Sequence, residues 1–180
     1  MDSFELKTYP DSCLRIKTKP VEKFDREVED VLRRISEMMY VNRGIGLAAT
    51  QMGLGLSIVV VDVGAGLKYF INPVIVERSS KKNKMEEGCL SLPGVVVNVS
   101  RPESIKVRAQ NEKGEFFMSK YDGLISKALQ HEIDHLNGKL IIDYLDPVRS
   151  FLAKRRLARA KYSRDAETCE VICNAGKTNI

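Results

Sequence analysis

The five residues HEIDH, at positions 131–135, contain both histidines of this 180-residue chain and decide how its fold is interpreted. On an α-helix, residues four apart lie on one face, with Cβ atoms about 5–6 Å apart. Two imidazoles at this spacing can bind one metal ion, and the adjacent Glu132 can act as general base toward a water molecule there. The pattern therefore predicts a metal-dependent hydrolase.

The residues around this pattern predict a helix from Gly123 to Asn137. Asp122 is a suitable N-cap, and Gly138 is a typical residue for ending a helix. The remaining apolar positions indicate that the helix is buried; they are Leu124, Ala128, Leu129 and Leu136. Buried histidine and glutamate side chains need partners, since unpaired buried polar groups are costly, and a metal supplies them. The alternative is an exposed helix whose histidines are only solvated.

Working outward, residues 25–41 predict another helix, with Asp25 as its N-cap. Runs of β-branched and aromatic residues predict strands at 56–63, 69–76, 95–99, 105–109 and 116–121, and a short strand at 140–142. The basic segment after Pro147 has helical spacing but a weak apolar stripe, so we expect a helix at about 148–162 that packs loosely or not at all. The predicted fold class is α+β, with strands packed around a central helix that bears the metal site and with a C-terminal helix.

A catalytic metal site needs a third protein ligand besides the two histidines. The downstream carboxylates Asp143 and Asp146 follow too closely to return to the helix easily. Cys89 is a better candidate because it lies in the Gly-containing segment EGCLS at 87–91. Its alternative role is that of a small buried hydrophobic residue, which is common for free cysteine.

A third segment, GIGLAATQ at 44–51, combines small residues with a terminal amide. Glycine and alanine permit close approach of another backbone, and the Gln51 amide can donate a hydrogen bond to an oxyanion. The segment lacks the spacing of a dinucleotide or phosphate-binding loop.

Together, GIGLAATQ at 44–51, EGCLS at 87–91 and QHEIDHLNG at 130–138 resemble the peptide deformylase family, and the likeness extends over residues 4–147. The resemblance implies removal of the N-formyl group from the formyl-methionine of newly synthesised proteins, with release of formate. It implies Cys89, His131 and His135 as metal ligands and Glu132 as the base. The Gln51 amide and the Leu90 N–H would then stabilise the negative charge on the formyl oxygen.

The resemblance also implies one divalent metal ion, Fe(II) in the cell, with Ni(II), Co(II) or Zn(II) as possible occupants of purified protein. The peptide would add as a strand along Gly44, Ile45 and Gly46, with Gly88 opposite. Leu124 and Leu129 are candidates for the pocket of the methionine side chain. Glu87, Gln130 and Asp134 could orient the ligands, although a structural hydrogen bond is an equal alternative for Asp134.

The net charge of +5 lies entirely in residues 148–180, which contain eight Lys/Arg and three acidic residues. We expect a catalytic domain at 1–147 and a basic extension at 148–180. The extension is either a solvated helix face or a surface for the phosphates of ribosomal RNA. Cys169 and Cys173 are expected to be free thiols. With no secretory signal, transit peptide or long apolar run, the expected location is the cytoplasm, with no membrane partner.

Two other functions remain open from the residues alone. An HExxH endopeptidase would use the same Glu132 and histidines but a downstream third ligand in place of Cys89. An RNA-binding module with a structural metal would need a closed site of four ligands, of which only three can be assigned.

Overall fold

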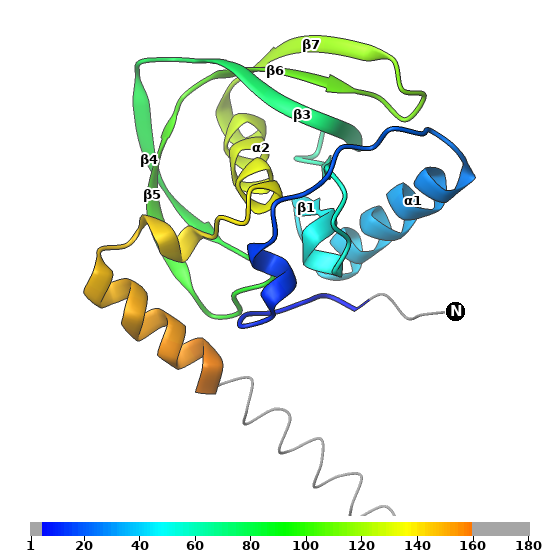
Figure 1. Ribbon diagram of the computed structural model, residues 1–180. Coiled ribbons are helices and arrows are strands. Elements are labelled where there is room, and N and C mark those ends of the chain that lie inside the picture. The colour runs from blue at the N-terminus through cyan, green and yellow to red at the C-terminus, as the bar shows by residue number, and fades with distance from the viewer. Residues whose placement is uncertain (1–4, 160–180) are drawn as a thin grey trace, which may run out of the picture.

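The computed structural model describes residues 5–159 (Figure 1). Two α-helices and seven strands have complete bounds within this range: α1 (Arg26–Val41), β1 (Gly46–Ala48), β2 (Ile58–Val61), β3 (Lys68–Arg78), β4 (Lys82–Gly88), β5 (Val96–Pro102), β6 (Ile105–Gln110), β7 (Phe116–Tyr121) and α2 (Gly123–Leu136). Three short 3-10 helices connect them: η1 (Ser12–Arg15), η2 (Ala49–Met52) and η3 (Ile141–Tyr144). This arrangement confirms the predicted α+β class.

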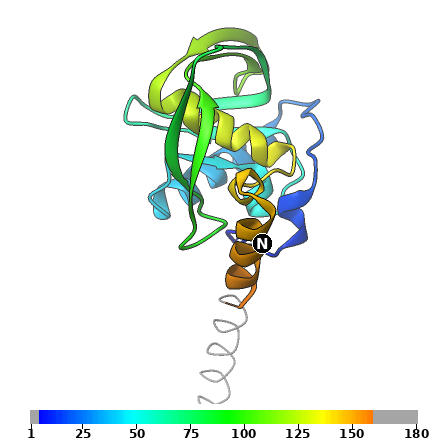
Figure 2. The ribbon, with the colours of Figure 1, turned by 90° about the vertical axis from the view of Figure 1, so that its left-hand side faces the viewer.

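The strands form two antiparallel sheets with α2 between them (Figures 1 and 2). The larger sheet has the order β1-β2-β3-β6-β7, and the smaller consists of β4 and β5. Every residue of β2 is buried, because Ile58 and Val60 pack toward α1 whereas Val59 and Val61 pack toward α2. The larger sheet is therefore covered on both faces at β2, and most of α2 is buried, as the sequence predicted.

The start of α1 and the end of α2 follow the predicted signals, whereas Asp122 precedes α2 without a capping hydrogen bond from its side chain. The Asp25 carboxylate accepts from the N–H groups of Glu27 and Val28 at the start of α1. After α2, Gly138 has φ +69°, and a Cβ there would collide with the carbonyl oxygen of Arg15. Glycine therefore ends α2 and lets the N-terminal segment pass directly beside it.

Two strands and one turn differ from the prediction. β1 and β4 were not predicted, because β1 is only three residues long and β4 is rich in Lys and Glu, which are poor strand formers. The strand predicted at 140–142 was wrong. The Asp143 carboxylate accepts from the Leu140 N–H and stabilises the turn η3, which buries Ile141 and Ile142 without strand pairing.

The C-terminal segment is helical from residue 147 to residue 159, where the described residues end. The helix packs more closely than expected at Leu157, which is only 3% exposed and lies in a core cluster with Leu14, Leu92 and Ile142. Its other large apolar residues agree with the expectation, since Val148, Phe151 and Leu152 are more than half exposed. The last residues of the predicted helix lie outside the described residues, and so do Cys169 and Cys173. The domain boundary between residues 147 and 148 stays a prediction. Within residues 5–159, no helix has the length and apolar character needed to span a bilayer.

Candidate metal centre and catalytic site

Three of the predicted ligands converge at one point. Cys89 follows the last residue of β4, and His131 and His135 extend from the same face of α2. One ligand atom from each lies within 4.8 Å of the other two. The Cys89 Sγ is 3.3 Å from the His135 Nε2, and the two imidazole ring centres are 5.0 Å apart. The long-range fold therefore brings Cys89 to the histidines, as the sequence predicted.

The chemistry of this cluster fits a divalent metal ion. Burial lowers the pKa of His135 well below its usual value, so the ring is neutral, which is the form that binds metals. One cysteine sulfur and two imidazoles provide three protein ligands, the number found in catalytic sites that keep one position open. Both Cys89 and His131 line a cavity, so a metal ion held by these residues would be accessible from it.

Glu87 and Arg101 form a buried ion pair that contacts the Nδ1 of His131. The Nδ1 of His131 is 3.0 Å from one oxygen of Glu87, and Arg101 donates to both oxygens of that carboxylate. Burial alone would raise the pKa of Glu87, but the hydrogen bonds from Arg101 and His131 lower it to about 2. Glu87 is therefore a carboxylate that can hold the imidazole by its Nδ1 and direct Nε2 toward the centre.

The same arginine also reaches α2. Its Nη1 donates to Asp134 at 2.8 Å and to the Tyr144 hydroxyl at 3.2 Å, and Tyr144 itself donates to Asp134 at 2.7 Å. Arg101 and Tyr144 were not among the predicted site residues. A signal was available for the arginine, because Arg101 continues the alternating buried positions Val97 and Val99 of β5, where a charge requires a partner.

Glu132 is buried beside the centre with no partner for its Oε2 in the described part of the chain. Burial raises the pKa of Glu132 to about 7, because the charged form is poorly solvated there. A Cβ at Gly46 would lie 2.7 Å from the Glu132 Oε1. Glycine at this position therefore lets β1 approach the glutamate, which can take up or release a proton near neutral pH.

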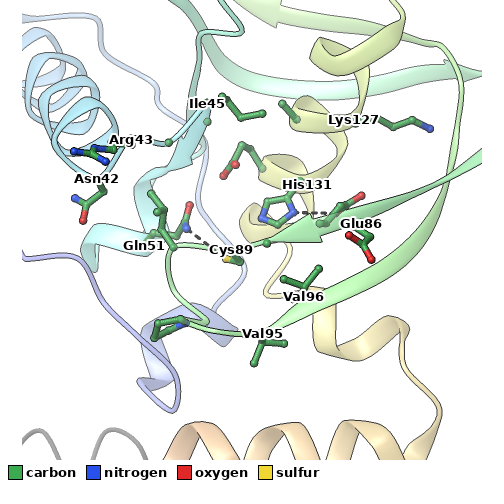
Figure 3. A pocket seen from close by; sticks show the side chains of 18 of the residues that line it. Asn42, Arg43, Ile45, Gln51, Glu86, Cys89, Val95, Val96, Lys127 and His131 are labelled. Atoms are coloured by element: carbon green, nitrogen blue, oxygen red, sulfur yellow. Dashed lines mark hydrogen bonds and ion pairs between the residues drawn. The ribbon is translucent and has the colours of Figure 1, made fainter.

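The Gln51 side chain and the Leu90 residue lie next to Cys89. The Gln51 Oε1 accepts from the Ala48 N–H at 2.9 Å, which turns the amide nitrogen toward the site. Its Nε2 lies 3.2 Å from the Ser91 Oγ and 3.8 Å from the Cys89 Sγ (Figure 3). Leu90 lies between Cys89 and Ser91 and lines the same cavity.

The cavity has a volume of about 790 Å³ and lies between outer strands of the two sheets. Gly44, Ile45 and Gly46 line one side, and Gly88 lines the other. Leu124 is 47% exposed and also lines the cavity, whereas Leu129 is fully buried in the core between α2 and the larger sheet. The structure therefore brings together every predicted substrate-binding residue except Leu129.

The other candidate ligands and orienting residues have structural partners. Asp143 pairs with both Nη atoms of Arg15, and Asp146 pairs with Arg149, so neither carboxylate joins the histidines. Gln130 donates to the Pro102 carbonyl at 3.1 Å, which ties α2 to β5. Lys127 has the same role, since its ammonium donates to the carbonyls of Arg101 and Pro102.

Comparison with known proteins agrees with this geometry. The family model for polypeptide deformylase matches residues 3–151. A peptide deformylase from Thermotoga neapolitana is 42% identical over 154 residues, which cover 86% of this chain and 94% of that protein. The crystal structure of a peptide deformylase from Legionella pneumophila superimposes with a TM-score of 0.84 at 38% identity, covering 89% of this chain and 96% of that one.

A second solved structure, peptide deformylase from Thermotoga maritima, superimposes with a TM-score of 0.78 at 41% identity. It covers 82% of this chain and is itself covered completely. The similarity in sequence and in structure thus extends over both sheets and the helix that bears the histidines. This chain belongs to the peptide deformylase family.

Proposed function

We propose that this chain hydrolyses the N-formyl group of formyl-methionine at the start of newly synthesised proteins, at the centre formed by Cys89, His131 and His135. The observation that carries the proposal is the position of Glu132. It is a buried carboxylate, without a partner for one oxygen in the described structure, beside three metal-ligand side chains and a cavity open to a peptide. The products are formate and a free methionyl amine.

A divalent cation held by Cys89, His131 and His135 would polarise the formyl carbonyl and acidify the attacking water. We propose Fe(II) as the ion in the cell, with Ni(II), Co(II) and Zn(II) able to occupy the same donor set. The neutral imidazole of His135 and the Glu87-supported imidazole of His131 suit any of these ions.

Glu132 is the proposed proton carrier of the reaction. Its carboxylate removes a proton from the water as the oxygen of that water forms a bond to the formyl carbon. When the carbon–nitrogen bond breaks, the same carboxyl returns the proton to the leaving nitrogen, and formate departs. Burial raises the pKa of this carboxyl toward neutral, which suits both steps because the group can then both accept and donate a proton.

The developing negative charge on the formyl oxygen needs donors that are already in place. The Gln51 Nε2 is fixed by the bond between its own Oε1 and the Ala48 N–H, and the Leu90 N–H lies on the adjacent segment. Removing one such donor typically costs about 10²–10³ in rate. We assign both groups to this role.

The substrate backbone is proposed to lie between the two sheets as an added strand. β1 and β4 are outer strands of their sheets, so each can pair with one more segment. Gly44, Ile45 and Gly46 are the proposed contacts on one side, and Gly88 on the other. Leu124 together with Ala128 supplies the apolar wall for the methionine side chain.

Formate release from a formyl-methionyl dipeptide tests the proposal. The protein would be purified anaerobically and loaded with Fe(II) or Ni(II), with Glu132→Ala in parallel and an acetyl-methionyl dipeptide as control substrate. We expect turnover of the formyl substrate by the wild type, and its loss in the variant while metal content is retained. A folded, metal-loaded wild type that releases no formate would overturn the assignment.

We also propose ribosomal RNA as a partner of the C-terminal helix. Binding to the ribosome would occur in the cytoplasm, where formylated chains emerge. Arg155 and Arg159 are exposed on this helix and provide charge for phosphate contacts. Deleting residues 148–180 would also remove the core residue Leu157, so point substitutions are the cleaner test. Ribosome binding by Arg155→Ala/Arg159→Ala that equals the wild type at low and moderate salt would rule out contacts of these two arginines with ribosomal RNA.

A further inference from the structure

A second groove, of about 640 Å³, lies between β5 and the C-terminal helix. Val96 and Asn98 of β5 form part of one wall. The other wall contains Arg149, Leu152 and Arg156, which share one helix face because they are separated by three and four residues. The neighbouring helix face carries the buried residues Ser150 and Leu157, so packing against the core holds this wall in place.

The groove adjoins the catalytic cavity. Gly94, Val95 and Val96 line both hollows and form the rim between them. In Figure 3, Val95 and Val96 lie on the side of the cavity that faces the C-terminal helix. A peptide whose first residue occupies the cavity can therefore cross this rim and enter the groove.

The surface of the groove suits an extended polypeptide with acidic side chains. Val96 and Leu152 are both more than half exposed and offer apolar contacts. β5 pairs only with β4 among the strands of residues 5–159, so its other edge has no strand partner there. Arg149 shares its charge with Asp146 at 3.4 Å, whereas Arg156 forms no ion pair within the described residues. The groove therefore has a net positive charge.

We propose that this groove binds the part of the formylated chain that follows the residues in the catalytic cavity, with a preference for acidic side chains. The inference rests on the proposed function, because it assigns a path to the rest of the same substrate. The reaction changes only the first residue, so contacts in the groove act on binding. They should lower KM and leave kcat unchanged.

Matched peptides test this proposal. Ten-residue formyl-methionyl peptides would share their first three residues and carry a pair of Glu or a pair of Lys at successive later positions. Formate release would be measured for the wild type, for Arg149→Ala/Arg156→Ala, and for Arg155→Ala/Arg159→Ala. The last variant is the control, because it removes the same charge from the same helix outside the groove. A formyl tripeptide serves as the short reference.

For the wild type at low salt, we expect kcat/KM to favour the Glu peptide over the Lys peptide by about three- to tenfold at one placement of the pair. The effect should lie in KM and weaken at high salt. Arg149→Ala/Arg156→Ala should bring the ratio close to one, the control variant should keep it, and the tripeptide should be turned over equally by all three proteins.

A wild-type ratio near one at every placement would overturn the proposal, as would an equal loss in the control variant, which would indicate a general effect of net charge. If Arg149→Ala/Arg156→Ala keeps the peptide ratio but loses affinity for ribosomes, the groove binds RNA instead. If the wild type fails to hydrolyse even the tripeptide, the proposed function itself fails, and the groove assignment fails with it.

Discussion

The Nδ1 of His131 lies 3.0 Å from the Oε2 of Glu87, which makes Glu87 the link between a metal-ligand histidine and the buried guanidinium of Arg101. Arg101 is only 3% exposed, and its guanidinium donates through Nε and Nη2 to the two carboxylate oxygens. This geometry fixes the imidazole ring and leaves its Nε2 for the metal. The orientation of one ligand thus depends on an arginine from β5, a strand that supplies no ligand itself.

Replacing Arg101 should weaken metal binding without removing a ligand. In Arg101→Lys, lysine keeps the positive charge but cannot form the bidentate hydrogen bonds to Glu87. Glu87 would therefore hold His131 less firmly. We expect about a 10- to 100-fold loss of metal affinity, measured by competition with a chelator. Arg15→Lys is the matched control, since Arg15 also donates through two nitrogens to a carboxylate, that of Asp143, away from the centre. Equal losses in both variants would contradict the role of Arg101.

The close approach of β1 to Glu132 should make Gly46→Ala harmful to catalysis. The added Cβ would lie 2.7 Å from the Glu132 Oε1, so the carboxylate must move. Misplacement of a catalytic group by about an ångström can cost roughly a hundredfold in rate, and we expect kcat to fall by tenfold or more. Gly55→Ala is the control, because nothing lies within 4 Å of its Cβ. Unchanged kcat in Gly46→Ala at full metal content would exclude this role for the glycine.

The activity should rise with pH as Glu132 loses its proton. Burial raises the pKa of this carboxyl from 4.5 to about 7, and only the deprotonated form can act as base. A bound cation favours the carboxylate and moves the pKa back downward. The ascending limb of kcat/KM should therefore have its midpoint between these two values in metal-loaded enzyme. A profile that is flat across this range, with metal content constant, would contradict Glu132 as the base.

Cys89→Ser distinguishes the deformylase centre from an HExxH endopeptidase. If the Cys89 thiolate is a ligand, its loss should reduce metal affinity by more than the roughly 10- to 100-fold typical of losing an outer partner. Cys13→Ser provides the control, because burial and the hydrogen bond with Asp11 raise the pKa of the Cys13 thiol to about 12 and keep it protonated. Metal retention by both variants would favour the endopeptidase reading and a different third ligand.

Several features of the site could be predicted because they depend on residues close in the sequence. The spacing of His131 and His135 places both on one helix face, and Gly138 marks the end of that helix. β4 was missed because its charged residues resemble a loop, and it is stabilised by pairing with β5. Leu124 and Leu129 are both apolar and both suit a pocket by residue type, but Leu124 lines the cavity whereas Leu129 packs in the core.

The sequence by itself determined the helix, its two histidines and its glutamate, since helical spacing is a local property of the backbone. With its three motifs it also determined the family. Only the tertiary structure decided that Arg101 supports His131 through Glu87, that Asp143 and Asp146 pair elsewhere, and that a groove beside the C-terminal helix adjoins the cavity. These relationships join residues far apart in the chain, and they form only when sheet pairing and core packing bring those segments together.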